Sequence, residues 1–476
     1  MLKTADRNLI ERIKSILLVV LTFSTILLLY FFWGNISPDN WSLIDREEEY
    51  ETIQAQELLI PDRMILSQGE DSYRILPEDQ WIPFRDGIAE FTGGETLVLE
   101  EITEEQYQAV MSLPSVRASF DYGIPLTALA TVYGFEPSSV YSGVETVSEI
   151  GYGEVSRESL LLRDEPRNKY YRIITAAGPV RLPEFLKRQQ QLDSPAYFQL
   201  GTYLGGEISN DTLIPVFLET DLEPFTLNRE NLNQNKEELA SVAQAFFGKT
   251  FDFVRKIEEG NGTIIYMYGY GQKILISQIN GVMEYKEVPV EAGRETGYGE
   301  SLQIALNYIT GHGAFESISG SIYTPVLKEV RYLPEGKGKY RFHFGLKLGG
   351  ATLSFPEEDP LIVEVEGGQV VYFRRDISSY DQSVGNGEGE IREAYSALNV
   401  IAENVDYFTR EMGLAGTFEE VADRIRHMEP CYRILREEND IAGAAYPAWR
   451  IRFDEQEAYF DLYTAEPLGH QKTRGE

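Results

Sequence analysis

The stretch ILLVVLTFSTILLLYFFW, from Ile16 to Trp33, contains eighteen residues and no charge. An α-helix rises about 1.5 Å per residue, so a helix of this length reaches almost across a hydrocarbon layer of about 30 Å. The aromatic residues Tyr30 to Trp33 at its end suit the membrane–water interface. We therefore predict a single transmembrane helix at 16–33, which divides the chain into a short stub and a long remainder.

Charge predicts which side of the membrane holds each part. Basic residues precede the stretch and acidic residues follow it: Lys3, Arg7, Arg12 and Lys14 come before, and Asp39, Asp45 and Glu47 to Glu49 come after. Positively charged flanks stay in the cytoplasm. We expect residues 1–15 to be a cytoplasmic stub, 34–56 to be a stalk, and the bulk of the chain to be extracytoplasmic at the cell membrane.

A cleaved secretory signal is the alternative to a retained anchor. Such a signal has a shorter apolar core, followed by a cleavage site with small residues. Gly34 to Pro38, directly after the stretch, provide no such site, and the only cysteine, Cys431, is far from the N-terminus. The sequence therefore favours an anchor that is retained, and it argues against a lipoprotein.

Composition limits the kinds of partner. The 476 residues include 76 acidic and 43 basic ones, which gives a net charge of -33. A surface with this charge repels nucleic acid, so we expect no nucleic-acid partner. One cysteine allows no intramolecular disulfide, and the hydrophobic fraction of 43% is that of a folded protein. The extracytoplasmic part must therefore be held together by hydrophobic cores.

The region 57–230 mixes helix and strand signals and is predicted to be one α+β domain. Thr103-Glu104-Glu105-Gln106 is a capping box that opens a short helix, which we expect to end at Met111. Val116, Ala118 and Phe120 then alternate as one face of a strand.

From 231 onward a helix followed by a strand meander recurs, in units predicted at 231–293, 294–380 and 381–476. In the second unit Tyr340 to Leu348 alternates strictly between apolar and polar residues. The third helix is predicted to run from Ile391 to Phe408. A helix with one apolar stripe packs economically across a sheet with one apolar face. The predicted fold class is therefore α+β, with repeated helix-on-antiparallel-sheet units behind the mixed domain.

The spacing of the histidines and of the cysteine predicts no catalytic site. His343 lies on the polar phase of its strand and is predicted to be solvated. His427 and Cys431 would share a helix face, but Pro430 intervenes and would break the helix. We therefore assign no catalytic, cofactor-binding or metal-binding residue, and we expect a protein that is not an enzyme.

Hydroxyl side chains form a stripe along the predicted span. Ser15, Thr22 and Thr25 project from one side of the helix, where they could bond to a neighbouring span. The alternative is that each hydroxyl bonds back to a carbonyl of its own helix. The sequence leaves both interpretations open, and these three residues are the only predicted partner contacts.

Stretches near the C-terminus carry a family resemblance. YPAWRI, from Tyr446 to Ile451, is followed by YFDLYT, from Tyr459 to Thr464, so that a proline and a tryptophan precede a strand ending in Asp-x-Tyr-Thr. A hairpin is expected from Ile362 to Phe373, ahead of Arg374-Arg375. Together with the single span and the helix-plus-meander units, these stretches resemble the YycH family, which is related to YycI and to PepSY-like domains.

This resemblance implies a membrane-anchored regulator without enzymatic activity. Its expected partner is a sensor histidine kinase of the WalK (YycG) type, contacted partly through the spans, and a YycI-like protein is a further expected partner. The expected outcome is altered cell-wall homeostasis in Gram-positive bacteria. Two other functions stay open: an anchored cell-wall hydrolase, which needs a cluster of acidic groups hidden by distance in the sequence, and a PepSY-like protease inhibitor or wall-ligand receptor.

Overall fold

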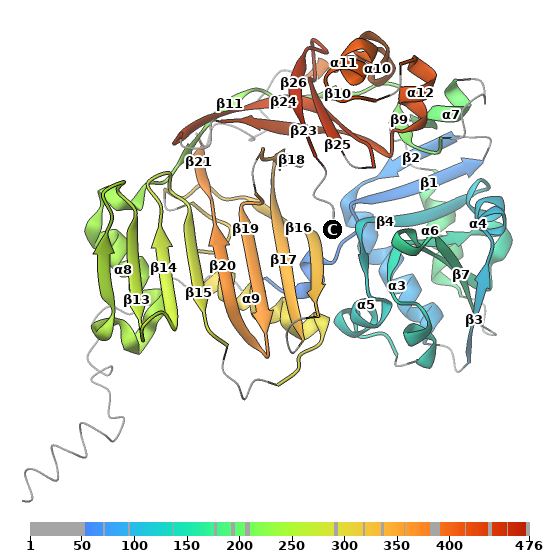
Figure 1. The fold of residues 1–476 in the computed structure, drawn as a ribbon. Helices are drawn as coiled ribbons and strands as arrows, with labels where there is room; N and C mark the ends of the chain where they lie inside the picture. Colours follow the sequence, from blue (N-terminus) through green and yellow to red (C-terminus); the bar gives the residue numbers. More distant parts are fainter. Residues whose placement is uncertain are drawn as a thin grey trace, which may run out of the picture. The chain divides into compact units, whose positions relative to one another are not determined.

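Two large sheets with helices packed on their faces make up most of the described chain (Figure 1). The computed structural model describes residues 53–69, 72–93, 96–136, 138–175, 179–191, 196–204, 210–289, 294–317, 319–334, 338–356, 358–380, 391–414, 416–436, 440–454 and 456–472. All of them fall in one compact unit, Glu51–Glu476. The predicted stub, the predicted span at 16–33 and the hydroxyl stripe of Ser15, Thr22 and Thr25 lie outside the described residues. Within the described ranges, no helix is long and apolar enough to cross a membrane.

The first sheet has nine strands in the order β3-β7-β6-β5-β4-β1-β2-β8-β9. Its strands are β1 (Arg63–Gly69), β2 (Ser72–Leu76), β3 (Leu97–Ile102), β4 (Ser115–Ile124), β5 (Val147–Gly153), β6 (Ser159–Asp164), β7 (Lys169–Thr175), β8 (Ala196–Gln199) and β9 (Leu213–Pro215). All neighbouring strands pair antiparallel. Val116, Ala118 and Phe120 are buried on one face of β4, as their alternation predicts.

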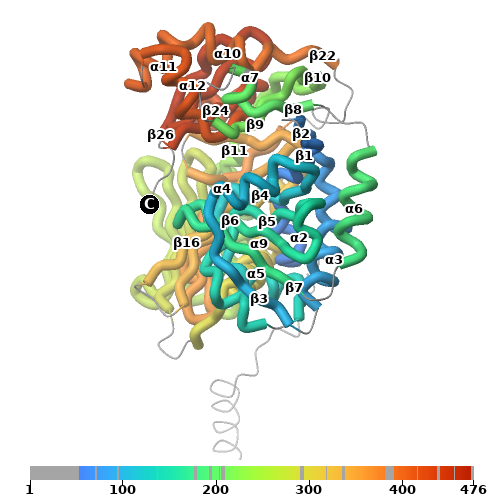
Figure 2. Tube along the Cα trace, turned by 90° about the vertical axis from the view of Figure 1, so that its right-hand side faces the viewer, coloured from blue at the N-terminus to red at the C-terminus, as the bar shows by residue number. Residues whose placement is uncertain are grey.

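Helices cover both faces of this sheet. They are α2 (Ala55–Leu58), α3 (Trp81–Thr92), α4 (Glu104–Met111), α5 (Leu126–Tyr133), α6 (Arg181–Gln189) and α7 (Leu200–Tyr203). Figure 2 shows α3 and α6 side by side, and the two helices contact each other. On the opposite face, α4 buries Tyr107 and Met111 against Leu161. The predicted capping box is confirmed, because Thr103 and Gln106 each bond to the other's backbone amide at the start of α4.

The larger sheet has fifteen strands, and eight of them form one continuous run in the order β12-β13-β14-β15-β20-β19-β17-β16. The eight strands of the run are β12 (Arg255–Glu258), β13 (Ile264–Tyr268), β14 (Lys273–Ser277), β15 (Met283–Glu287), β16 (Thr324–Leu333), β17 (Lys339–Leu348), β19 (Leu361–Glu366) and β20 (Gln369–Arg375), and the short strand β18 (Ala351–Ser354) also pairs with β17. Helices α8 (Lys236–Phe247) and α9 (Tyr298–Gly311) pack on one face of this run. Aromatic rings join the layers, since Phe246 of α8 and Tyr308 of α9 both contact Phe373 of β20.

Glycine pairs make the tight turns of this run. Gly349 and Gly350, between β17 and β18, have φ angles of 57° and 81°, and Gly367 and Gly368, between β19 and β20, have 60° and 82°. Two successive positive φ angles are those of a type I′ hairpin turn, which residues with a Cβ rarely adopt. The hairpin predicted from Ile362 to Phe373 is therefore present as β19 and β20.

The remaining strands of the larger sheet are β11 (Phe225–Arg229), β21 (Ser378–Tyr380) and the C-terminal strands, which lie beside the C-terminal helices. The C-terminal elements are β23 (His427–Leu435), β24 (Ala442–Arg452), β25 (Gln456–Asp461) and β26 (Pro467–Lys472), with α10 (Ala397–Glu403), α11 (Val405–Arg410) and α12 (Phe418–Asp423). A separate pair is formed by β10 (Glu219–Thr220) and β22 (Arg392–Glu393). Strand β18 pairs parallel with β23 and links the two parts of the sheet. Strand β11 pairs with β24 and β21, so 225–229 belongs to this sheet rather than to the predicted 57–230 domain.

The single helix predicted from Ile391 to Phe408 is wrong. Ile391 is exposed, and helix α10 begins only after Ser396. The path breaks again at Asn404, whose side chain donates hydrogen bonds to the carbonyls of Val400 and Ala465. Side-chain bonds of this kind compete with the helix backbone, so two short helices replace one long one.

Candidate functional site: a charged cavity

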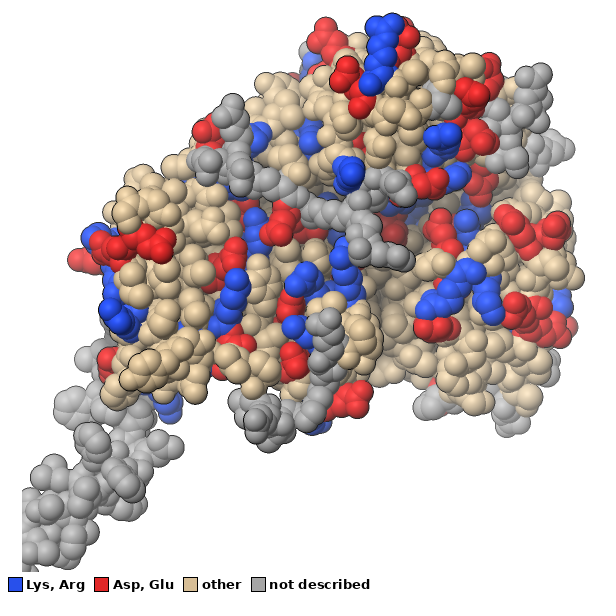
Figure 3. All heavy atoms as spheres, viewed as in Figure 1, with Lys and Arg blue, Asp and Glu red and all other residues tan. Residues whose placement is uncertain are grey.

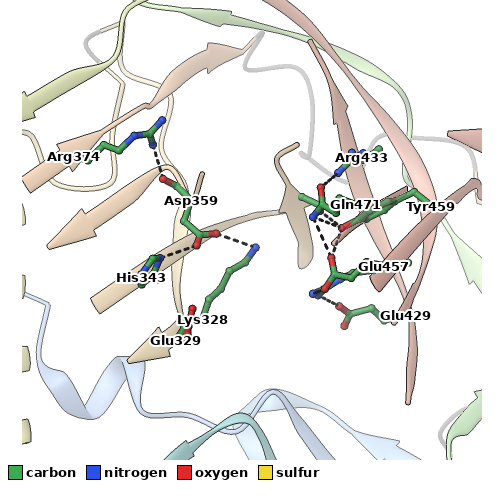
Figure 4. Close-up of polar contacts among 12 residues, drawn as sticks. Lys328, Glu329, His343, Asp359, Arg374, Glu429, Arg433, Glu457, Tyr459 and Gln471 are labelled. Carbon is green, nitrogen blue, oxygen red and sulfur yellow. Dashed lines mark hydrogen bonds and ion pairs between the residues drawn. The ribbon is translucent and has the colours of Figure 1, made fainter. Parts of the chain in front are cut away.

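A cavity of about 660 Å³ lies where three groups of strands meet. The ends of β1 and β4 supply one wall, β16 and β17 supply a second, and β23 to β26 supply the third. Figure 4 shows the polar side chains of the second and third walls facing each other across the gap. This volume is typical of a small-molecule site.

Two of the walls are sheet faces that no helix of the described residues covers. On β17 the apolar phase, which includes Phe342, packs towards α9, and His343 and Lys347 point the other way. On β24 the side chain of Trp449 is buried in the core with α10 and α11, and Arg450 points into the cavity. Figure 3 shows basic and acidic side chains interspersed over the face of the larger sheet seen in Figure 1.

The second wall is organised around Asp359, which lies in the loop between β18 and β19. His343 contacts its carboxylate at 3.0 Å through Nδ1, and Lys328 Nζ lies 3.6 Å from the other oxygen. Arg374 donates a hydrogen bond of 2.7 Å to the Asp359 carbonyl. His343 is only 7% exposed, so the prediction of a solvated histidine is wrong. Alternation along β17 does place His343 on the polar face of the strand, but the loop that carries Asp359 covers this face.

The third wall is organised around Glu457 of β25. Arg450 pairs with Glu457 and donates a 2.9 Å bond to Glu429, and Tyr459 donates a 2.5 Å bond to Glu457. Gln471 donates to the same carboxylate at 3.2 Å. Burial alone would raise the pKa of Glu457, but the Arg450 guanidinium lowers it to about 2. This carboxylate is therefore charged and fully partnered.

The first wall holds two neighbouring carboxyl groups. The backbone amide of Asp121 donates a 2.6 Å hydrogen bond to Asp62 Oδ2, and Arg452 lies 3.4 Å from the Asp121 carboxylate. Burial, followed by the charge of Asp121, raises the pKa of Asp62 to about 7. Burial alone would raise the pKa of Asp121, but the nearby Arg452 and then His427 lower it to about 2. One carboxyl group is thus half protonated near neutral pH beside another that is fully charged.

The charge of the lining differs from that of the whole chain. Among the described lining residues, seven are basic and six are acidic: Arg63, Arg167, Lys328, Lys347, Arg450, Arg452 and Lys472 against Asp62, Asp121, Glu329, Asp359, Glu429 and Glu457. The whole chain has 43 basic and 76 acidic residues. The lining is therefore close to charge balance, with one more basic than acidic residue, in a strongly acidic protein.

Nucleophilic and metal chemistry find little support in the described residues. His427 and Cys431 lie on one strand, β23, where four residues span about 13 Å, so they do not form a pair. Burial raises the pKa of the Cys431 thiol to about 12, which keeps it protonated. The described part of the chain contains no group of three or more His, Cys, Asp or Glu arranged to hold a metal ion.

Sequence reasoning assigned none of the cavity residues to a functional site; Pro430 was named only as a helix breaker, and Trp449 and Arg450 only as part of the family resemblance. Asp62 directly precedes β1, and Asp121, Lys347 and Arg450 lie on three other strands far apart in the chain, so no spacing connects them. The only local indication is the charged residues at alternate positions of β17 and β24. They predict a polar sheet face, but they do not predict which segment covers it. The predicted stripe of Ser15, Thr22 and Thr25 lies outside the described residues.

Comparison with solved structures supports the resemblance found in the sequence. The chain is similar to the crystal structure of YycH from Bacillus subtilis, with a TM-score of 0.54 and 11% sequence identity, over 85% of this chain and 96% of that chain. An uncharacterized protein from Eubacterium rectale ATCC 33656 matches with a TM-score of 0.34 and 10% identity, over 56% of this chain and 87% of that one. The Bacillus megaterium YpeB C-terminal domain matches with a TM-score of 0.26 and 12% identity, over 50% and 98%.

No protein-family model matches the sequence, and no curated protein matches it. The match to YycH extends over nearly the whole of that chain, so the protein has a YycH-like fold, and the predicted structural resemblance is confirmed.

Proposed function

Starting from the YycH-like fold, we propose that this chain is a membrane-anchored regulatory protein that acts outside the cytoplasm and modulates a sensor histidine kinase of the WalK type. The observation that carries the proposal is the structural match, which extends over 85% of this chain and 96% of the YycH chain. The uncharged stretch from Ile16 to Trp33 supplies the anchor that such a role requires.

The residues that carry the resemblance lie in the core. Trp449 of β24 pairs with Phe460 of β25, and both side chains are buried. These stretches are therefore explained by folding rather than by a contact with the kinase. The kinase contact is assigned instead to the span and to exposed surface.

A protein that performs no reaction on its partner can change that partner only by binding its states unequally. Coupling between two binding sites is typically about 1–3 kcal/mol, or roughly 5- to 150-fold in an equilibrium constant. The proposed regulator must therefore bind one signalling state of the kinase more tightly than the other.

The test is co-reconstitution of the full chain with a WalK-type kinase in liposomes, with kinase autophosphorylation and co-purification as the readouts. We expect the autophosphorylation level to change by about fivefold or more. Replacing Ile16 to Trp33 by an unrelated span should weaken co-purification, and the triple change of Ser15→Ala, Thr22→Val and Thr25→Val should do so in part if the hydroxyl stripe faces the kinase. Autophosphorylation that is the same with and without the chain would contradict the proposal.

An anchored cell-wall hydrolase is the second candidate, and Asp62 and Asp121 favour it. Their environments push their pKa values apart, as happens in pairs of catalytic carboxyl groups. The bond from the Asp121 amide and the ion pair with Arg452 give both carboxyl groups a structural role as well. Wall-hydrolysing activity of the full chain that disappears in Asp62→Asn would favour the hydrolase over the regulator.

A further inference from the structure

Several basic groups in the cavity lack a close carboxylate. The Nε of Arg63 is buried and has no hydrogen-bond partner, and no carboxylate of a described residue lies within 4 Å of its guanidinium. Lys347 Nζ lies 3.8 Å from Glu78, its only ion-pair partner among the described residues, and Lys328 Nζ lies 3.6 Å from Asp359. Both distances exceed that of a good charge-assisted hydrogen bond, about 2.8 Å.

The carboxylates of the cavity show the opposite pattern. Glu429 and Glu457 share Arg450, Asp121 pairs with Arg452, and Asp359 pairs with His343. The two that remain are also partnered, since Asp62 accepts an amide bond and Glu329 pairs with Arg331. Each carboxylate in the described lining thus has a donor, and the unmet charge in the cavity is positive.

The three basic groups Arg63, Lys328 and Lys347 line the same cavity. Asp62 and Glu429, the carboxyl groups that lie with them in the lining, are already bonded to other donors. Arg63 is half-buried, and its Nε is removed from water without a close counter-charge; this arrangement is costly, and a bound anion would offset the cost.

We propose that the cavity binds a small organic anion, whose carboxylate or phosphate is held by Arg63 and Lys347, with Lys328 at its side. The volume of about 660 Å³ leaves room for an uncharged part of the ligand, and Tyr122, Tyr197 and Phe355 in the lining give that part an apolar surface. Anion binding does not require a kinase, so the inference goes beyond the proposed function and stands or falls independently of it.

The long-range field of the protein opposes such binding. With a net charge of -33 the surface repels anions at a distance, so affinity must come from close contacts inside the cavity. Removing one close cation should therefore weaken binding much more than removing a distant one. This contrast supplies the control.

The experiment is calorimetric titration of inorganic diphosphate into the full chain, held in phosphatidylcholine nanodiscs at physiological salt. We expect saturable binding, and we expect Arg63→Gln and Lys347→Gln each to weaken it about tenfold or more, because a charge-assisted bond is lost. Lys187→Gln, on the exposed side of α6, removes the same charge outside the cavity and should leave the Kd unchanged.

A second arm distinguishes soluble anions from lipid headgroups. In nanodiscs that contain phosphatidylglycerol, an apparent Kd weaker than in phosphatidylcholine would identify the headgroup as a competitor with the same chemistry, and an equal Kd would identify a soluble anion. The absence of saturable binding in both discs would overturn the proposal. So would a Kd that Arg63→Gln and Lys347→Gln leave at the wild-type value.

Discussion

Two groups of charged residues, one around Asp376 and one around the cavity, contain the same types of residue but differ in how closely their charges are paired. Asp376 follows β20 and receives two hydrogen bonds from Arg229, at 2.9 and 2.7 Å, with the guanidinium groups of Arg374 and Arg436 at 3.8 and 3.6 Å. All four side chains are almost fully buried. In the cavity, Arg63 and Lys347 face open volume without a close carboxylate. Charges that stabilise the fold are therefore distinguished from charges available to a ligand by how closely they are paired, and not by residue type.

The largest expected effect comes from removing the centre of the matched group. Asp376→Ala leaves several buried guanidinium groups around an empty position, so we expect the free energy of unfolding to fall by about 3–5 kcal/mol. Asp406→Ala is the control, because Asp406 is also paired with an arginine but is highly exposed, and it should cost at most about 0.5 kcal/mol. Chemical denaturation of both variants measures these changes. An equal loss in unfolding free energy for the two variants would contradict the distinction between the buried group and an exposed ion pair.

The cavity wall itself should matter less than the Asp376 group. Arg450→Met leaves Glu429 and Glu457 without their shared cation, and Glu429 can recover part of the loss from water because it is partly exposed. We expect a loss of about 2–3 kcal/mol in the same denaturation experiment. A loss as large as that of Asp376→Ala would mean that this wall holds the fold as strongly as the Asp376 group does.

Asp62 provides a pH test of the cavity. Its pKa is raised to about 7 by burial and by Asp121, with Lys347 opposing and Glu429 adding to the shift. Between about pH 4 and pH 7 the folded protein holds a proton that the unfolded chain has released, so the contribution of Asp62 to stability falls as pH rises through this window. We expect Asp62→Asn to raise stability at pH 8 by about 1–2 kcal/mol and to match the wild type near pH 4. A difference that is constant with pH would contradict the assigned shift.

The smallest effect on stability is expected from the unmatched cations. Lys347→Gln removes only a 3.8 Å contact with the exposed Glu78, so the free energy of unfolding should change by at most about 0.5 kcal/mol. Thermal unfolding without added anions measures this change. A large loss would show that Lys347 is a structural residue.

Local patterns predicted the elements better than they predicted the site. Strict alternation from Tyr340 to Leu348 predicts a strand with one buried face, and β17 has that form, because the period of a strand is a property of neighbouring residues. The same alternation predicts a solvated His343, and this failed because the loop that carries Asp359 covers the polar phase. The alternation of residues along a strand does not predict which distant segment covers its polar face.

The cavity was not predictable for the same reason. Asp62 and Arg450 come from opposite ends of the described chain, and acidic residues are so frequent in this sequence that a pair of them carries no information. The break at Asn404 shows a local limit as well, since its side chain bonds to Ala465, a partner that helical periodicity does not reveal. The resemblance carried by Tyr446–Ile451 and Tyr459–Thr464 predicted the YycH-like fold. Most of those residues lie in the buried β24–β25 hairpin, and only Trp449 and Arg450 among them also line the cavity.

The most direct measurement is the melting temperature of the full chain with and without inorganic diphosphate, for the wild type, for Asp406→Ala and for the Arg63→Gln, Lys347→Gln double variant. Ligand at a hundredfold excess over Kd stabilises the folded state by about 2.7 kcal/mol. The account predicts that diphosphate raises the melting temperature of the first two proteins and not of the double variant, although all three melt at nearly the same temperature without it. An equal rise in the double variant would contradict the claim that the unmatched cations bind an anion.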